Sequence, residues 1–309
     1  MSSAPVVPVG LVEQVEAETS PRRRRKKLDA TRAVSSPWAT VVAIVIATVW
    51  TVPTVGLLIT SFRTQADITR SGWWTIFSNP EFTLDNYAQA LSGSGSASML
   101  DYFINSLVIT IPSTLIPLTL ASLAAYGFAW LRFPGRDWLF IVVFALQVVP
   151  LQVALVPLMQ MYGALGIDGT YWTVWISHTA FGLPLAVWMM FNSIRDQPPA
   201  LIEAATIDGA SPVQIFLRII LPLATPAIAS YGIFQFLWTW NDLLVSMVFL
   251  GGSPAAAPLT VYISQLTGSR GSAWYLLSAG AFISMVIPVV VFLLLQRYFV
   301  RGLTAGAVK

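Results

Sequence analysis

The chain has 309 residues, of which 56% are hydrophobic and only 10% are charged, with a mean hydropathy of +0.70 and a formal net charge of +3. Soluble domains carry about 25% charged residues, so this composition excludes an ordinary soluble protein. The chain has no cysteine, which excludes disulfides, thiol catalysis and iron–sulfur centres. His178 is the only histidine, so the sequence excludes a metal site built from several histidines. We expect His178 to be a polar residue packed between helices or near the outer interface, not a catalyst.

Residues 1–37 form a polar leader that contains the basic run PRRRRKK at 21–27. We expect this leader to be disordered, cytoplasmic and bound to anionic lipid headgroups through its basic run. The apolar segment that follows is far longer than the roughly 7–15 residues of a signal peptide, so we do not expect cleavage.

Long stretches without any charged residue follow the leader, and each is at least as long as the roughly 20 residues needed to cross a bilayer. A soluble helical core would need six consecutive buried helices without a charged face. The sequence therefore predicts an all-α integral membrane domain over 38–309 with six transmembrane helices. The predicted spans are about 38–61, 102–131, 138–162, 172–192, 222–250 and 274–296.

Two local patterns add detail to these spans. The second span contains the small residues ASLAAYG at 121–127, which allow close approach of helix backbones. The external segment before it contains FTLDNYAQAL at 82–91, which we predict to be a short amphipathic helix.

The distribution of basic residues predicts the orientation. With a cytoplasmic N-terminus, fourteen of the seventeen Lys and Arg residues lie in cytoplasmic segments, and only Arg63, Arg70 and Arg270 lie outside. This is the positive-inside bias of multi-pass proteins. We therefore expect both termini to be cytoplasmic.

The cytoplasmic segment 193–221 is predicted to form two short helices around one turn. Pro198 and Pro199 suit a helix start, and the first helix is expected to end near Asp208 with Gly209 in a left-handed conformation. Ser211 and Gln214 then form a Ser-x-x-Gln capping box for the second helix.

The two helices are predicted to expose different surfaces. The second is expected to present its apolar residues at helical spacing, namely Val213, Phe216, Leu217 and Ile220. The first and the turn carry small residues that would fit into, or form, a socket, namely Ala204, Ala205, Gly209 and Ala210.

The same segment resembles the coupling motif of ABC importer permeases, Glu-Ala-Ala, three residues, Gly, nine residues, Ile-x-Leu-Pro. The matching residues are Glu203, Ala204, Ala205, Gly209, Ile219, Leu221 and Pro222. Further segments resemble the carbohydrate-uptake branch, among them NSLVIT at 105–110 and FLWTWNDLL at 236–244. The tail at 297–309 is similar to that of the smaller permease of the maltose transporter.

The resemblance implies a type I ABC importer transmembrane fold in a bacterial or archaeal plasma membrane. It implies a heterodimer with a second, homologous permease, two cytoplasmic ATPase subunits and an extracytoplasmic sugar-binding protein, with membrane lipid around the chain and no nucleic acid. The ATPase-coupling residues would be the matched set together with Asp208 and Ala210.

We expect this chain to hold no cofactor and to be non-catalytic, with ATP and Mg²⁺ bound by the partner ATPase. A P-loop needs a Gly-rich turn followed by Lys. The only lysines are Lys26, Lys27 and Lys309, and none follows such a turn.

A candidate translocation pathway includes Trp238, Trp240, Asn241 and Asp242. Asp242 is the one acid near the interior of a span, and an ionisable group there is a functional candidate. It could bind solute hydroxyls, act as a hydrogen-bonded group between helices, or couple to protons. Tyr298, Arg301 and Gly302 in the tail are candidate contacts to the ATPase, or a plain positive-inside anchor.

No Lys or Arg lies well inside a span, which favours a neutral solute. Disaccharides and oligosaccharides are the leading candidate solutes, with polyols or glycerol phosphates as the alternative in the same family.

A stand-alone secondary transporter is the alternative from another class of protein; it needs paired broken helices or intramembrane charges. A membrane-embedded enzyme needs a catalytic constellation, and the sequence shows none.

Overall fold

The computed structural model describes residues 37–92, 98–267 and 273–307, with side chains described as far as Gln296. Over these ranges its regular secondary structure is entirely helical. The chain divides into two compact units, residues 1–59 and 60–309. The leader prediction for residues 1–36 lies outside the described residues.

The first unit contains most of α3 (Pro37–Ser61), a 25-residue apolar helix with Pro53 in its interior. Two threonine hydroxyls donate back to carbonyls one turn earlier, Thr48 to Ile44 O at 2.8 Å and Thr51 to Ala47 O at 2.6 Å. These bonds give the two hydroxyl groups a partner inside the helix, as a segment in hydrocarbon requires.

The second unit is built on three long helices, α6 (Met99–Trp130), α9 (Tyr171–Arg195) and α16 (Trp274–Ala307). With α3, they are the four helices among the described residues that are long and apolar enough to cross a membrane singly. Two bent helix pairs raise the number to six if each pair is one span. This agrees with a multi-pass membrane protein.

The predicted third span is bent. It consists of α7 (Arg136–Ala145), the 3₁₀ turn η2 (Leu146–Val148) and α8 (Leu151–Leu165), and its two halves meet at 100°. Val149 and Pro150 are extended, with ψ of 119° and 125°. Proline disfavours the helical conformation in the residue before it, so the straight helix expected over 138–162 ends at this point.

The predicted fifth span is also divided. The segment Pro212–Leu223, which ends in α12 (Leu221–Leu223), meets α13 (Thr225–Trp240) at 72°. The helix α14 (Leu244–Leu250) begins after a second break. Pro222 and Pro226, four residues apart, each lack the N–H that a continuous helix needs. Length and apolarity over 222–250 predicted the location of the segment but not these breaks.

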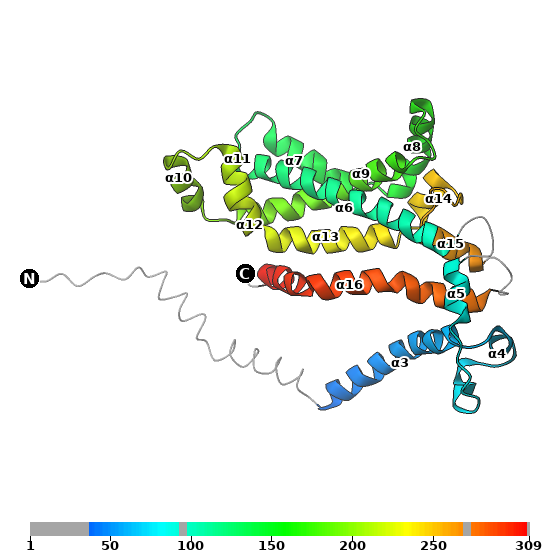
Figure 1. The fold of residues 1–309 in the computed structure, drawn as a ribbon. Helices are drawn as coiled ribbons and strands as arrows, with labels where there is room; N and C mark the ends of the chain where they lie inside the picture. Colours follow the sequence, from blue (N-terminus) through cyan, green and yellow to red (C-terminus); the bar gives the residue numbers. More distant parts are fainter. Residues whose placement is uncertain (1–36, 93–97, 268–272, 308–309) are drawn as a thin grey trace, which may run out of the picture. The chain divides into compact units, whose positions relative to one another are not determined.

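Short elements gather at the end of the second unit where α6 and α16 begin (Figure 1). They are α4 (Gln65–Arg70), the 3₁₀ turn η1 (Trp73–Phe77), α5 (Asp85–Ser92) and α15 (Leu259–Thr267). The predicted amphipathic helix in 82–91 is therefore confirmed as α5. Its Asn86 side chain is buried and donates to Ser61 O at 2.9 Å and Arg63 O at 2.8 Å. These bonds fix α5 to the segment that begins the unit.

Small residues form the contact between α6 and α9, as the pattern at 121–127 predicted. Ala121 and Ala125 of α6 and Ala186 of α9 are fully buried in one apolar cluster. Small side chains at this contact let the two helix backbones approach closely, which is the main source of packing energy between helices in lipid.

A buried polar network joins the same two helices to α13. Tyr231 Oη lies 2.8 Å from both Gly182 O and Gln235 Oε1, and Gln235 Nε2 donates to Ser113 O at 3.1 Å. A Cβ atom at Gly182 would come within 2.7 Å of Tyr231 Oη and 2.5 Å of Gln235 Oε1. Gly182 is therefore required by the close passage of α13.

We predict that Gly182→Val lowers the unfolding free energy of the detergent-solubilised protein by about 1–3 kcal/mol, because the added methyl groups displace side chains held in buried hydrogen bonds. Thermal unfolding followed by tryptophan fluorescence would measure it. Gly127→Val on α6 is the matched control, since a Cβ there meets no atom within 4 Å. Equal midpoints for the two variants would contradict this account of the packing.

Candidate functional site

The segment 193–221 forms a hairpin of two short helices, α10 (Pro199–Ile207) and α11 (Pro212–Ile215). Gly209 has φ of +81°, the left-handed conformation predicted for it. Ala210 N donates to Ala205 O at 2.9 Å and Gly209 N donates to Thr206 O at 3.1 Å. This pair of bonds is a Schellman motif, which closes the carbonyl end of α10.

The predicted capping box opens the second helix of the hairpin. Ser211 N donates to Gln214 Oε1 at 2.8 Å, and Gln214 N donates to Ser211 Oγ at 3.3 Å. Pro212 occupies the first helical position, where its missing N–H has no helical acceptor to lose. The local conformation of the whole turn is thus determined by a few side chains of its own sequence.

The apolar face of the second helix differs from the prediction. Ile215, Phe216 and Ile220 are buried, whereas Val213 and Leu217 are exposed. A π-helical turn, η3 (Phe216–Ile220), changes the phase of the helix from Leu217 on, whereas the exposed Val213 lies before this turn. A constant spacing of 3.6 residues therefore does not describe the second part of this segment.

The base of the hairpin is anchored in the apolar core formed by α6, α9 and α13. The rings of Tyr126 and Phe216 lie 5.3 Å apart, and Tyr126 Oη donates to Pro212 O at 3.3 Å. Gln197, just after α9, donates from Nε2 to Ile220 O at 3.3 Å. These contacts come from α6 and from the residues that directly follow α9, so a displacement of the hairpin would be transmitted to both.

The surface of the hairpin carries the predicted coupling residues in two layers. Most of them are exposed, namely Glu203, Ala204, Asp208, Gly209 and Pro222. The others are half-buried, namely Ala205, Ala210, Ile219 and Leu221. Ala205, Ala210 and Leu221 pack against the core cluster. The small-residue surface is thus divided, with Ala204 and Gly209 facing outward and Ala205 and Ala210 supporting them from beneath.

Ile207 is the residue of this site that sequence reasoning missed. It ends α10 beside the turn, and 86% of its surface is exposed. An apolar residue directly before Asp208-Gly209 was the available signal, since that position lies at the tip of a hairpin. Exposed apolar residues at a tip, rimmed by polar ones, indicate a contact surface.

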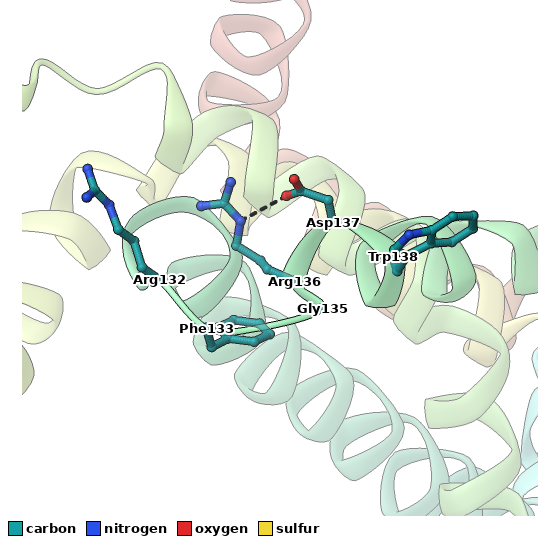
Figure 2. A pocket seen from close by; sticks show the side chains of 6 residues that line it. All are labelled: Arg132, Phe133, Gly135, Arg136, Asp137 and Trp138. Atoms are coloured by element: carbon teal, nitrogen blue, oxygen red, sulfur yellow. Dashed lines mark hydrogen bonds and ion pairs between the residues drawn. The ribbon is translucent and has the colours of Figure 1, made fainter.

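The turn between α6 and α7 adds positive charge near the hairpin. Figure 2 shows Arg132 and Arg136 directed to one side of this turn, with Arg136 paired to Asp137. The Arg136 Nε to Asp137 Oδ1 distance is 3.0 Å, and the turn borders an open pocket of about 390 Å³. Arg195 ends α9 and Arg218 lies in η3, so the four arginines share the hairpin end of the unit.

The second group of predicted residues lies at the opposite end of α13. Trp238 is half-buried, Asn241 is exposed and the Asp242 side chain is 8% exposed. Trp240 is buried, and its indole N–H donates to Ser284 O of α16 at 3.1 Å. Trp240 therefore packs against α16 in this chain, and its place in a translocation pathway stays a prediction.

Two further expectations concern the tail and metals. Tyr298, Arg301 and Gly302 lie within α16, but their side chains are outside the described residues, so their role stays a prediction. Within the described residues, no three acidic or histidine side chains lie close enough together to hold a metal ion.

This hairpin, projecting from one end of a bundle of spanning helices, defines the class of the protein. Residues 117–305 match the family described as binding-protein-dependent transport system inner membrane component. The chain belongs to this family, and it is a permease subunit of an ABC importer.

Individual relatives agree with this assignment. The chain is 53% identical to the osmoprotective compounds uptake permease protein GgtD of Synechocystis sp., over 85% of this chain and 89% of that protein. It is 50% identical to the alpha-glucoside transport system permease protein AglG of Rhizobium meliloti, over 77% of this chain and 63% of that protein.

A solved structure shows the same fold. It is the crystal structure of a bacterial ABC transporter involved in the import of the acidic polysaccharide alginate, with a TM-score of 0.68 at 20% identity, over 85% of this chain and 98% of that one. The predicted type I importer fold is therefore confirmed.

We predict that the effect of substitution at Gly209 depends on backbone conformation and not on space, because a Cβ there meets no atom within 4 Å although φ is +81°. Gly209→Val should destabilise the turn by about 1–2 kcal/mol, since a β-branched residue is strained in the left-handed region. Gly209→Asn should cost less, because Asn tolerates that conformation.

Hydrogen exchange of the amides around residues 205–214 would measure the local opening of the turn in both variants. Equal exchange rates in Gly209→Val and Gly209→Asn would show that the left-handed conformation is not what the turn requires.

Proposed function

We propose that this chain forms half of the translocation pathway of an ATP-driven sugar importer and couples that pathway to a cytoplasmic ATPase. The other half would come from a second, homologous permease. Two ATPase subunits would bind ATP and Mg²⁺, and an extracytoplasmic binding protein would deliver the solute. The chain itself would carry no catalytic site and no cofactor.

One observation carries this proposal. The hairpin exposes Ile207 and small residues at its tip, while its base is packed between α6, α9 and α13. A surface of this kind can fit into a cleft on another protein and transmit its movement to the spanning helices. Coupling then follows from ATP favouring one of two arrangements of the assembly.

The orientation follows from the charges at the two ends of the second unit. The hairpin end carries Arg132, Arg136, Arg195 and Arg218, whereas Arg63 and Arg70 lie in the segment that follows α3, before α6 begins. This distribution supports a cytoplasmic hairpin and, with the basic leader, cytoplasmic termini in a bacterial or archaeal plasma membrane.

The solute we propose is a neutral disaccharide or oligosaccharide, with alpha-glucosides first because AglG, which is 50% identical over 77% of this chain, is named for their transport. The absence of Lys and Arg from the interiors of the predicted spans supports a solute without charge. The similarity to GgtD favours small osmoprotective compounds as the second candidate.

We predict that Ile207→Cys cross-links to the ATPase subunit in native membranes, and the absence of natural cysteine makes such single-cysteine chemistry specific. A heterobifunctional maleimide reagent followed by mass spectrometry would identify the neighbour. Asp168→Cys, in the exposed turn between α8 and α9, is the control and should capture no ATPase. Capture of the ATPase from position 168 but not from position 207 would show that the hairpin lies on the side opposite to the ATPase and would contradict the proposed orientation.

We predict that Ile207→Asp lowers ATP-driven uptake at least tenfold, because burying an isoleucine is worth about 1.5–3 kcal/mol and a carboxylate would be desolvated in its place. Uptake of radiolabelled alpha-glucosides into proteoliposomes would be measured with the full assembly and with this chain alone. Solute movement by the chain alone would support the secondary-transporter alternative and contradict the importer proposal.

A further inference from the structure

One face of α13 carries two aromatic residues and an amide in a single line. Phe234, Trp238 and Asn241 follow one another at intervals of four and three residues, which places them on the same side of a helix. Phe234 is 49% exposed, Trp238 is half-buried and Asn241 is exposed. We call these three residues the α13 stripe.

Asn241 lies inside the predicted fifth span, about 222–250, directly after the sixteen residues of α13. Its exposure therefore places an amide in a segment that is expected to lie within hydrocarbon. Its Nδ2 donates to Leu237 O of its own helix at 2.7 Å. The amide oxygen has no partner among the described residues. An exposed amide at this depth is costly against lipid tails, so the α13 stripe is expected to face water or another polar surface.

Asp242, the neighbouring residue, is turned the other way. Its Oδ1 accepts from Val245 N at 3.1 Å, and its Oδ2 accepts from Ser246 N and Ser246 Oγ at 2.8 Å each. These bonds cap the start of α14. The carboxylate is thereby bonded within the protein, and its side chain is only 8% exposed.

His178 and Thr260 hold the same break from two other helices. His178 Nε2 of α9 lies 3.5 Å from Asp242 Oδ2, and the imidazole meets the indole of Trp238 edge to face with ring centres 5.1 Å apart. Thr260 of α15 donates from its hydroxyl to Asp242 O. The break between α13 and α14 is therefore hydrogen-bonded to α15 through Thr260 and packs against α9 at His178, whose ring nitrogens make no hydrogen bond among the described residues.

We propose that the α13 stripe is a solute-contacting surface of the translocation pathway. Asn241 would exchange hydrogen bonds with solute hydroxyls, and Phe234 and Trp238 would cover the apolar faces of sugar rings. Asp242 and His178 are positioning residues that hold the break and touch no solute. The proposal rests on the proposed import function for the identity of the solute, but not for the prediction that this face is accessible to water.

The first experiment measures water access and needs no transport. Asn241→Cys and Phe234→Cys are made in the cysteine-free chain, and the assembled complex in native membranes is treated with the hydrophilic reagent 2-sulfonatoethyl methanethiosulfonate. We expect both positions to react at least tenfold faster than Leu115→Cys, the apolar control, which lies with Val108 and Ile111 in an exposed row of α6 without a polar side chain.

Reaction of the Asn241→Cys and Phe234→Cys variants with lipid-soluble N-ethylmaleimide alone would place the α13 stripe against lipid and overturn the proposal. Reaction in the isolated chain but not in the complex would place it against the second permease, with the same consequence. Phe234→Cys keeps the test decisive if Asn241→Cys fails to fold.

The second experiment separates contact from positioning. In ATP-driven uptake of maltose or trehalose, Asn241→Leu should raise KM about three- to tenfold with little change in the maximal rate, and Asn241→Gln, which keeps an amide, should recover part of the loss. An unchanged KM in Asn241→Leu, with fast hydrophilic labelling at position 241, would refute solute contact while leaving the import function standing.

The role of the positioning residues is tested with His178→Gln and Asp242→Asn. Each of these substitutions is combined in turn with Asn241→Cys and with Phe234→Cys. Each should change the labelling rate at position 241 more than threefold and leave the rate at position 234, which precedes the break, unchanged. Equal effects at both positions would indicate general destabilisation and contradict a positioning role. No effect at position 241 would show that these residues do not hold the break.

Discussion

The constraint on which this structure depends is that polar groups within hydrocarbon must find their partners inside the protein. Every departure from a straight helix in the second unit releases backbone groups that lipid cannot satisfy. The break after α13 is tolerated because the Asp242 carboxylate accepts the N–H groups of Val245 and Ser246 in the first turn of α14. The buried amide of Gln235 is tolerated because Ser113 O and Tyr231 Oη lie within hydrogen-bond distance. The fold is thus defined by where polar side chains sit among apolar ones.

The same constraint connects the two regions of functional interest. Both lie at the ends of α13: the hairpin leads into its first turn, and the α13 stripe ends at its last. In the middle of α13, Tyr231 and Gln235 join this helix to α6 and α9. A helix anchored at mid-length by buried hydrogen bonds moves with its neighbours as a unit. Movement at the hairpin would therefore reach Asn241 through packed helices and would not require flexibility within the α13 helix.

In the hairpin, local and tertiary interactions determine different properties. Its turn is stabilised by its own residues, through the Schellman motif at Gly209 and the capping box at Ser211. Its orientation instead comes from distant ones, through Tyr126 and Gln197. A surface that must fit another protein needs both, since the turn gives it shape and the anchoring gives it direction.

The sequence by itself determined the membrane class, the location of the apolar segments and the conformation of the hairpin turn. These features depend on composition and on short-range rules, such as the left-handed glycine and the capping box, which act within a few residues. The close contact of α6 and α9 was also readable, because small residues at 121–127 have few other uses in a span. The coupling role of the hairpin residues stays a prediction.

Only the tertiary structure decided which way each side chain faces and where the spans bend. Pro150 marks a point where the third span can break, but the 100° angle of that bend and the π turn at η3 are seen only in the structure. Trp240, Asn241 and Asp242 are adjacent in sequence, yet they turn respectively to α16, outward and to α14. No pattern in the sequence separates them, because their environments are supplied by residues that the sequence places elsewhere in the chain.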